Sequence, residues 1–256
     1  MSYPSDLTDS EWKILEPLVK QGKMGRPREH STREILDAIF YIVKGGNQWR
    51  MMPKDFPPWK TVYDYFYRWK KNGFWDAIHD ELRSQCRKQV GKEETPSAAI
   101  IDSQSVKTVQ KRGQRGYDAG KKTKGRKRHI AVDTLGLLLC IVVHSASIQD
   151  RRGSKLVFLK MLKQFPRLSL IWADGGYSGE KLASWVKAMC GWMLEIVKRS
   201  DNLKGFHILP KRWIVERTFG WLNWSRRLTK DFEHTTKSSE FMVKIAMIRI
   251  MTKRLA

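Results

Sequence analysis

The stretch that decides the fold runs LSLIWADGGYSGEKLASWVKAM over residues 168–189. It opens with a short apolar run that stops at Asp174, and a Gly-Gly turn follows directly. From Gly179 onward, apolar residues recur at helical spacing. This order predicts a buried strand over 168–173 followed by a turn and a helix over 179–189, the repeating unit of α/β proteins.

Comparable segments flank this unit on both sides. Upstream, a short apolar strand at 98–101 ends on Asp102, and a Thr-Leu-Gly turn after Asp133 predicts a hairpin. The remaining expected elements are strands over 129–133, 137–143 and 192–198 and helices over 151–165, 211–228 and 238–254. Three antiparallel strands followed by alternating helices and strands predict an α/β fold, a ribonuclease H-like mixed sheet with flanking helices.

The first 92 residues follow a different pattern and predict a small all-α domain. Capping boxes at Thr8 and Ser31 each precede an amphipathic run. Two more helices are expected over 61–71 and 74–90, and the polar stretch 91–96 is expected to be a linker. The predicted domains are therefore a helical domain over 1–92 and an α/β domain over 97–256.

The helix expected over 61–71 is the natural candidate to enter a DNA groove. Arg68 near its end would contact phosphates, together with two following lysines. Its aromatic residues Tyr63, Phe66 and Trp69 could stack on bases, but their spacing favours packing in the core.

Composition narrows the class of protein. The 256 residues carry 49 Lys and Arg against 26 Asp and Glu, a formal net charge of +23, and 41% are hydrophobic. That apolar content excludes a disordered basic tail. We find no apolar run long enough to span a membrane and no apolar signal-peptide core, so we expect an intracellular folded protein. Three widely spaced cysteines argue against disulfides and zinc.

The positive charge is concentrated in the second part of the chain. Residues 1–96 have a net charge of +3 and residues 97–256 a net charge of +20. The densest stretch, 107–128, holds ten basic residues and one acid, and its glycines predict a flexible loop. A loop of this charge attracts phosphate backbones. The expected DNA contacts there are Lys107, Lys111, Arg112, Arg115, Lys121, Lys122, Lys124, Arg126, Lys127 and Arg128.

Three acids are candidates for the chemistry. Asp102 and Asp174 follow predicted strands, and Glu216 lies in a helix that is otherwise largely apolar. Carboxylates that converge from two strand ends and a helix suit Mg²⁺ or Mn²⁺, and two such ions can catalyse phosphodiester displacement. Each acid also has a simpler interpretation. Asp174 could cap a turn, Asp102 could cap a helix or a turn, and Glu216 could pair with Arg212 or Arg217 within its helix.

Two other acids have simple structural interpretations. Asp133 is expected in the hairpin turn and Asp150 as a helix N-cap.

Four motifs in one order make the chain recognisable: IIDSQSVKT, the basic glycine-rich stretch, ADGGYSGEKL and RWIVERTFGWLNWSRRL. Together they resemble the DDE transposases of bacterial insertion sequences, in the insertion-sequence-5 group. The resemblance implies that Asp102, Asp174 and Glu216 are the catalytic, metal-binding triad, with two Mg²⁺ ions for which Mn²⁺ can substitute. It also implies double-stranded DNA as partner, both terminal inverted repeats and target DNA, and a homodimer on the DNA ends. By the same resemblance, the helical domain over 1–92 would bind the DNA ends, the domain over 97–256 would be catalytic, and the protein would be cytoplasmic, bacterial and associated with the nucleoid.

A signature around the last acid is matched only in part. Arg212 takes the position of its arginine and would contact a phosphate near the cut. Leu209 and Asn223 stand where the wider superfamily has tyrosine and lysine, and Arg226 and Lys230 could substitute. The rival functions are a stand-alone metal-dependent nuclease of the same fold and a non-catalytic DNA-binding remnant of a transposase.

Overall fold

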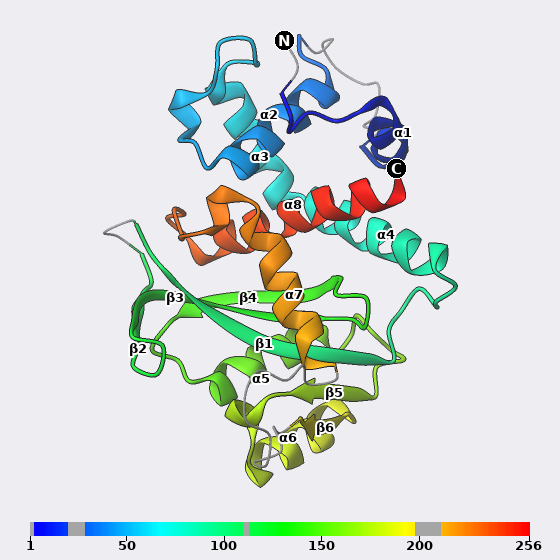
Figure 1. Cartoon of the computed structure of the whole chain (residues 1–256), viewed down its shortest axis with the longest axis vertical. Helices are drawn as coiled ribbons and strands as arrows, with labels where there is room; N and C mark the ends of the chain where they lie inside the picture. Colours follow the sequence, from blue (N-terminus) through cyan, green and yellow to red (C-terminus); the bar gives the residue numbers. More distant parts are fainter. Residues whose placement is uncertain (1–2, 20–28, 110–112, 198–210) are drawn as a thin grey trace. The chain divides into compact units, whose positions relative to one another are not determined.

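The computed structural model describes residues 3–19, 29–109, 113–197 and 211–256 (Figure 1). The chain divides into two compact units. The helical unit comprises Met1–Lys92, Leu222–Thr229 and Phe241–Ala256, and the sheet unit comprises Glu93–Trp221 and Lys230–Glu240. The break after Lys92 lies at the expected linker. The helical unit also includes two later segments, which the sequence analysis assigned to the domain over 97–256. None of the described helices is long and apolar enough to cross a membrane.

Helices make up the first unit. Its elements are α1 (Asp9–Val19), α2 (Thr32–Gly45), η1 (Trp49–Met51), α3 (Trp59–Lys71), α4 (Phe74–Gln89), η3 (Arg226–Leu228) and most of α8 (Thr236–Leu255). Both predicted capping boxes are present. The Ser31 hydroxyl accepts from the Glu34 N–H at 3.2 Å, and Glu34 accepts from the Ser31 N–H at 2.7 Å. Thr8 and Glu11 form the same reciprocal pair.

The core of the helical unit contains large aromatic residues. Phe66 and Trp69 on α3 are buried, as their spacing predicted, whereas Tyr63 is 37% exposed. The α8 residues of this unit are apolar almost all round the helix, from Phe241 to Met251. A helix without a polar face must be buried among other helices, which explains why this end of the chain belongs to the helical unit.

The second unit is built on a six-stranded sheet. Its strands are β1 (Ala98–Lys107), β2 (Gly116–Asp118), β3 (Thr123–Val132), β4 (Leu138–Ser145), β5 (Leu170–Ala173) and β6 (Met193–Ile196). The order is β2-β3-β1-β5-β6, and β4 also pairs with β3. β1, β3 and β4 are antiparallel, while β5 pairs parallel with both β1 and β6. This mixed sheet confirms the ribonuclease H-like prediction.

Helices cover both faces of this sheet. The helices of the unit are α5 (Asp150–Met161), η2 (Gly175–Tyr177), α6 (Glu180–Cys190) and α7 (Arg212–Asn223). α5 and α6 pack on one face through a continuous apolar cluster that includes Ile101, Phe158 and Val186. α7 crosses the opposite face (Figure 1). Its Thr218 hydroxyl donates to the carbonyl of Gly136 at 2.9 Å in the β3–β4 turn.

The basic glycine-rich stretch differs from the prediction, because its glycines serve close packing rather than flexibility. It forms β2 and most of β3 instead of a loop. A Cβ on Gly125 would collide with the backbone of β1 at Val106 and Lys107. Glycine here lets two strands approach closely, which sequence alone does not distinguish from a flexible linker.

Candidate active site

The pairing of β1 with β5 brings two of the predicted acids together. These strands run parallel with Ala98 opposite Leu170 and Ile100 opposite Trp172. Continuing that register by two residues places Asp102 level with Asp174. Asp102 lies inside β1 and not at its end as predicted, but β5 stops at Ala173, so the strand beside Asp102 is missing on that side. Asp102 therefore lies beside the carboxyl end of β5, where Asp174 follows.

Asp102 lies in a setting that disfavours its charge. Its Oδ1 accepts the N–H of Ser103 at 2.7 Å. The pKa of Asp102 is raised to about 6, mainly by burial and in smaller part by the nearby charge of Asp174, although the Ser103 N–H and the cations Lys121 and Arg212 act to lower it. A cation placed beside a buried carboxylate of this kind stabilises its charged form.

Asp174 performs the capping role that sequence offered as its simpler interpretation. Its Oδ1 accepts the N–H of Gly176 at 2.8 Å and so caps η2. Its Oδ2 lies 3.9 Å from Nη2 of Arg212. The cap uses one carboxylate oxygen and fixes the other toward α7, so capping and a role in the site are compatible.

Glu216 does not lie amid apolar surface, contrary to the expectation. Ile214 and Val215 face the core, while the Glu216 side chain is 50% exposed. Its Oε1 lies 2.9 Å from Nη2 of Arg212, one turn earlier on α7. The intrahelical pair that sequence offered as an alternative is therefore present, and it places Glu216 beside the arginine that also faces Asp174.

The charge of Arg212 thus acts on all three predicted acids. Arg212 forms ion pairs with Asp174 and Glu216, and its charge acts on Asp102. Within the described residues, no three acids, histidines or cysteines lie close enough to enclose a metal ion in this arrangement. The donor set nevertheless fits one, because carboxylate oxygens are the ligands that Mg²⁺ and Mn²⁺ prefer. Arg212 supplies a positive charge at the same place.

A buried chain of hydrogen bonds supports this site and was not foreseen. Nδ1 of His144 donates to the Ser145 carbonyl at 2.9 Å, so its Nε2 accepts from Nδ1 of His129 at 3.1 Å. Nε2 of His129 then accepts the hydroxyl proton of Tyr177 at 2.7 Å. The Ser145 carbonyl can only accept a hydrogen bond, so it fixes the tautomer of His144 and, through His144, the tautomer of His129. Burial lowers the pKa of His129 to about 3, which keeps this chain neutral.

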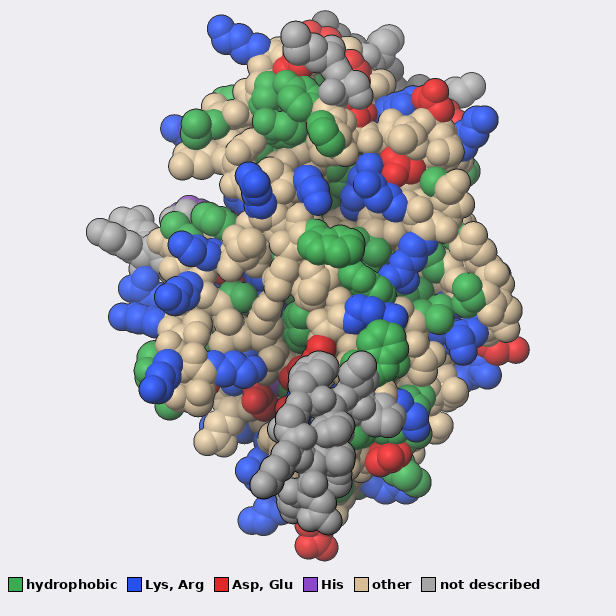
Figure 2. Space-filling model, in the orientation of Figure 1, with side chains coloured by type: hydrophobic (Ala, Val, Ile, Leu, Met, Phe, Trp, Pro, Cys, Tyr) green, Lys and Arg blue, Asp and Glu red, His purple; other side chains and the backbone are tan. Residues whose placement is uncertain are grey.

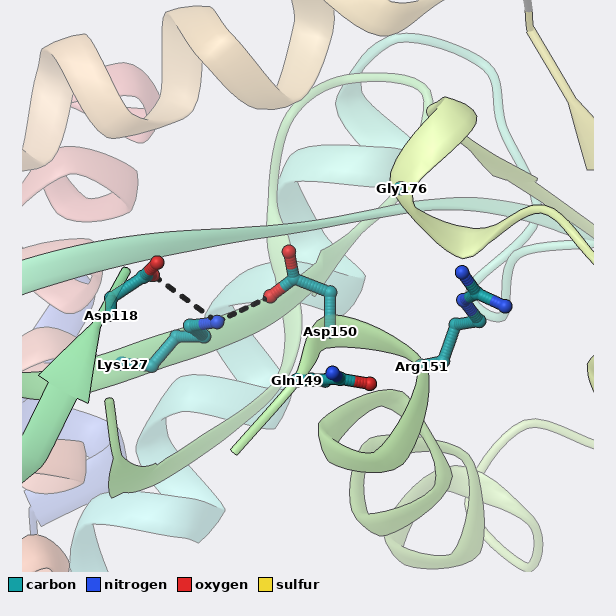
Figure 3. A pocket seen from close by; sticks show the side chains of 6 residues that line it. All are labelled: Asp118, Lys127, Gln149, Asp150, Arg151 and Gly176. Atoms are coloured by element: carbon teal, nitrogen blue, oxygen red, sulfur yellow. Dashed lines mark ion pairs between the residues drawn. The ribbon is translucent and has the colours of Figure 1, made fainter. Parts of the chain in front are cut away.

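A second unforeseen cluster surrounds Lys127 (Figure 3). Its ammonium lies 2.9 Å from Asp150 and 3.3 Å from Asp118. Asp150 also accepts the hydroxyl of Ser103 at 2.8 Å, next to Asp102. Asp150 is not the N-cap of α5 as predicted, because Gln149 holds that position. Asp133, in contrast, lies in its hairpin turn and accepts two backbone N–H groups there.

The predicted DNA contacts fall into three sets. Arg126, Lys127 and Arg128 are buried, which corrects the expectation of exposed side chains. Arg126 donates to three carbonyls and forms an ion pair with Asp231, and Arg128 donates to the Lys230 carbonyl. The exposed ones are Lys107, Arg115, Lys121, Lys122, Lys124 and Lys230 in the sheet unit and Arg68 and Arg226 in the helical unit. Lys111, Arg112 and Leu209 lie outside the described residues.

Lysine and arginine side chains are prominent over the β2–β3 hairpin in the space-filling view (Figure 2). The Lys121 ammonium also donates to the carbonyl of Ser103 at 2.7 Å, which ties this hairpin to β1 beside Asp102. The exposed charge therefore extends up to the acids.

Family models and known proteins match parts of this chain. Residues 93–251 match the family described as "Transposase DDE domain", and residues 7–79 match "Putative transposase of IS4/5 family". The chain is 29% identical over 122 residues to an insertion element IS402 uncharacterized 16.2 kDa protein of Burkholderia cepacia, covering 42% of this chain and 79% of that protein. It is 31% identical over 74 residues to the uncharacterized protein y4sN of Sinorhizobium fredii, covering 28% and 58%.

The first family match covers more than half of the chain, including all three acids and every strand of the sheet. At the general level, a domain of this kind is a metal-dependent enzyme that acts on DNA and transfers nucleotidyl groups. This chain belongs to the family of DDE-domain transposases.

Proposed function

We propose that this protein cuts DNA at the inverted repeats of an insertion sequence and joins the freed 3′ hydroxyls to target DNA. The observation that carries the proposal is the gathering of Asp102, Asp174 and Glu216 around Arg212, at the edge of a ribonuclease H-like sheet. Strand cleavage and strand transfer are the same displacement with different nucleophiles, so one site can catalyse both.

Each residue has a stated role. Asp102 and Asp174 would hold two Mg²⁺ ions, or Mn²⁺ in their place, jointly, and Glu216 would complete the second site. When bound, the ions activate the attacking oxygen and neutralise charge on the leaving oxygen. Arg212 would turn from its carboxylate partners to a phosphate of the strand near the cut, as a planar guanidinium binds either group well.

The exposed basic residues would hold the DNA backbone. Those of the β2–β3 hairpin, such as Lys122 and Lys124, would bind phosphates that flank the cut, with Lys107 and Arg115 beside them. In the helical unit, Arg68 and Arg226 would contribute to binding the inverted repeats. Because two ends must be joined in one reaction, we expect a homodimer on DNA.

The test is a strand-transfer assay. A labelled fragment that carries one flank of the gene, with its 3′ hydroxyl exposed, is incubated with a supercoiled plasmid and Mg²⁺ or Mn²⁺. We expect wild-type protein to form joined products and Glu216→Gln to form none. Glu180→Gln, which removes an exposed acid at the start of α6, is the matched control and should behave as wild type.

Two outcomes would contradict the proposal. Metal-dependent cleavage without any joined product would favour the stand-alone nuclease. Binding of the fragment with neither cleavage nor joining, in both proteins, would favour a DNA-binding remnant.

A further inference from the structure

A polar cavity of about 250 Å³ lies beside the η2 turn, which contains Gly176 (Figure 3). It is lined by Asp118, Lys127, Gln149, Asp150, Arg151 and Gly176. Gly176 connects it to the active site. A Cβ on this residue would lie 3.0 Å from Oδ1 of Asp174 and 3.8 Å from Oδ2 of Asp150. Whatever fills the cavity would therefore lie next to Asp174.

The lining presents hydrogen-bond donors and acceptors side by side. On the donor side, the exposed side chains of Gln149 and Arg151 have no hydrogen-bond or ion-pair partner among the described residues. The acceptor is Asp150. Its Oδ1 accepts the Ser103 hydroxyl and forms an ion pair with Lys127, whereas its Oδ2 lies toward Gly176. Lys127 neutralises much of the charge of Asp118 and Asp150, since it forms an ion pair with both.

This combination selects the kind of ligand. A phosphate would meet the carboxylate of Asp150, and the repulsion would offset its attraction to Arg151. A nucleobase carries N–H donors for a carboxylate next to ring or carbonyl acceptors for a guanidinium or an amide, and carries no charge. The cavity, at about 250 Å³, leaves room for one heterocycle.

Given the proposed function, on which this inference rests, we propose that this cavity binds a single unstacked base of the DNA next to the cut, with Arg151 and Asp150 reading its edge. A base can reach such a cavity only after it leaves the helical stack. Arg151 would then be a specificity residue, because it contacts a base and does not contact the reacting phosphate.

The test is an abasic scan of DNA binding, made without divalent metal so that catalysis does not enter. Duplexes that carry the gene's flank and one abasic site each are titrated with wild type, Arg151→Gln and Arg152→Gln. Arg152 is also exposed but does not line the cavity, so its variant removes the same charge from the neighbouring position. For wild type and Arg152→Gln we expect one position near the cut where loss of the base weakens binding about tenfold.

Arg151→Gln should bind the intact and the abasic duplex at that position equally. A scan of Arg151→Gln that matches wild type at every position would overturn the inference. So would a wild-type scan without any sensitive position near the cut. Cleavage of the intact flank by wild type, measured in parallel with Mg²⁺, separates these outcomes from a failure of the proposed function.

Discussion

Nη2 of Arg212 lies 2.9 Å from Oε1 of Glu216, its neighbour one turn along α7, and 3.9 Å from Oδ2 of Asp174. The guanidinium thus neutralises two carboxylates that would otherwise repel each other. It also favours the charged form of Asp102. In this arrangement Arg212 stabilises the acids in the place where a metal ion would be expected to do so.

Replacing Arg212 by glutamine should therefore make the protein more dependent on metal for stability. The variant keeps a side-chain donor for Glu216 but loses the positive charge. We expect Mg²⁺ to raise the Tm of Arg212→Gln more than that of wild type. Without the positive charge of Arg212, the carboxylates repel one another, so bound Mg²⁺ stabilises the folded variant more. Arg152→Gln is the control. Equal Mg²⁺ shifts in all three proteins, measured by differential scanning fluorimetry, would contradict this role.

Arg126 should contribute to folding rather than to DNA binding. It is 1% exposed, donates to the carbonyls of Gln114, Glu233 and His234 at 2.7–2.8 Å and forms an ion pair with Asp231. Arg126→Gln leaves a buried carboxylate without its cation, so the free energy of unfolding should fall by about 3–5 kcal/mol. Urea unfolding measures this loss. A loss below about 1 kcal/mol would show that the buried pair adds little.

Lys124 should show the opposite behaviour. It is exposed on β3, only two residues before Arg126. Lys124→Gln should leave the unfolding free energy within about 0.5 kcal/mol of wild type. The slope of log K against log salt for DNA binding should become shallower by about 0.9, since one phosphate contact fewer releases one counterion fewer. Fluorescence anisotropy over a range of salt concentrations measures the slope, and an unchanged slope would remove Lys124 from the interface.

The fold was largely predictable from the sequence, and the reasons are local. The capping boxes at Thr8 and Ser31 and the apolar run before Asp174 are signals that neighbouring residues create themselves. The extension of β1 to Lys107 was not predictable, because Ser103 and Ser105 look unlike strand residues. Their hydroxyls donate to Asp150 and Asp118, which lie 47 and 13 residues further along the chain.

The candidate acids were chosen from local sequence patterns. Asp102 and Asp174 follow predicted strands, and Glu216 lies in a helix that is otherwise largely apolar; the catalytic role of all three stays a prediction. The burial of Arg126 and Arg128 was not foreseen, because in sequence they cannot be distinguished from the exposed lysines around them. Their acidic and carbonyl partners come from residues 230–234, about a hundred positions later.

Asp37 in the helical unit predicts a dependence of stability on pH. Burial raises the pKa of Asp37 to about 6, and its Oδ1 accepts the N–H of Leu7 at 2.8 Å. In the unfolded chain this pKa is near 4. Between these values the folded protein binds the proton more strongly, so the contribution of Asp37 to stability falls as pH rises from about 4 to 6.

Asp37→Asn keeps the acceptor for Leu7 and removes the charge. At pH above about 7 the variant should be more stable than wild type, on the order of 1–2 kcal/mol after allowance for partial exposure, and the gain should vanish near pH 4. Thermal unfolding of both proteins across this range tests the prediction. Asp64→Asn, at an exposed position on α3, is the control and should show no such trend. A gain that does not change with pH would contradict the assignment.

The central claim is that Asp102, Asp174 and Glu216 act together as metal-binding catalytic residues. The most direct measurement is single-turnover cleavage of the labelled flank with Mg²⁺ by Asp102→Asn, Asp174→Asn and Glu216→Gln, with DNA affinity measured alongside. The account predicts that each substitution lowers the cleavage rate at least about a thousandfold, roughly 4 kcal/mol in transition-state stabilisation, while DNA affinity and the Glu180→Gln control stay close to wild type. Any one of the three variants cleaving at the wild-type rate would contradict the claim.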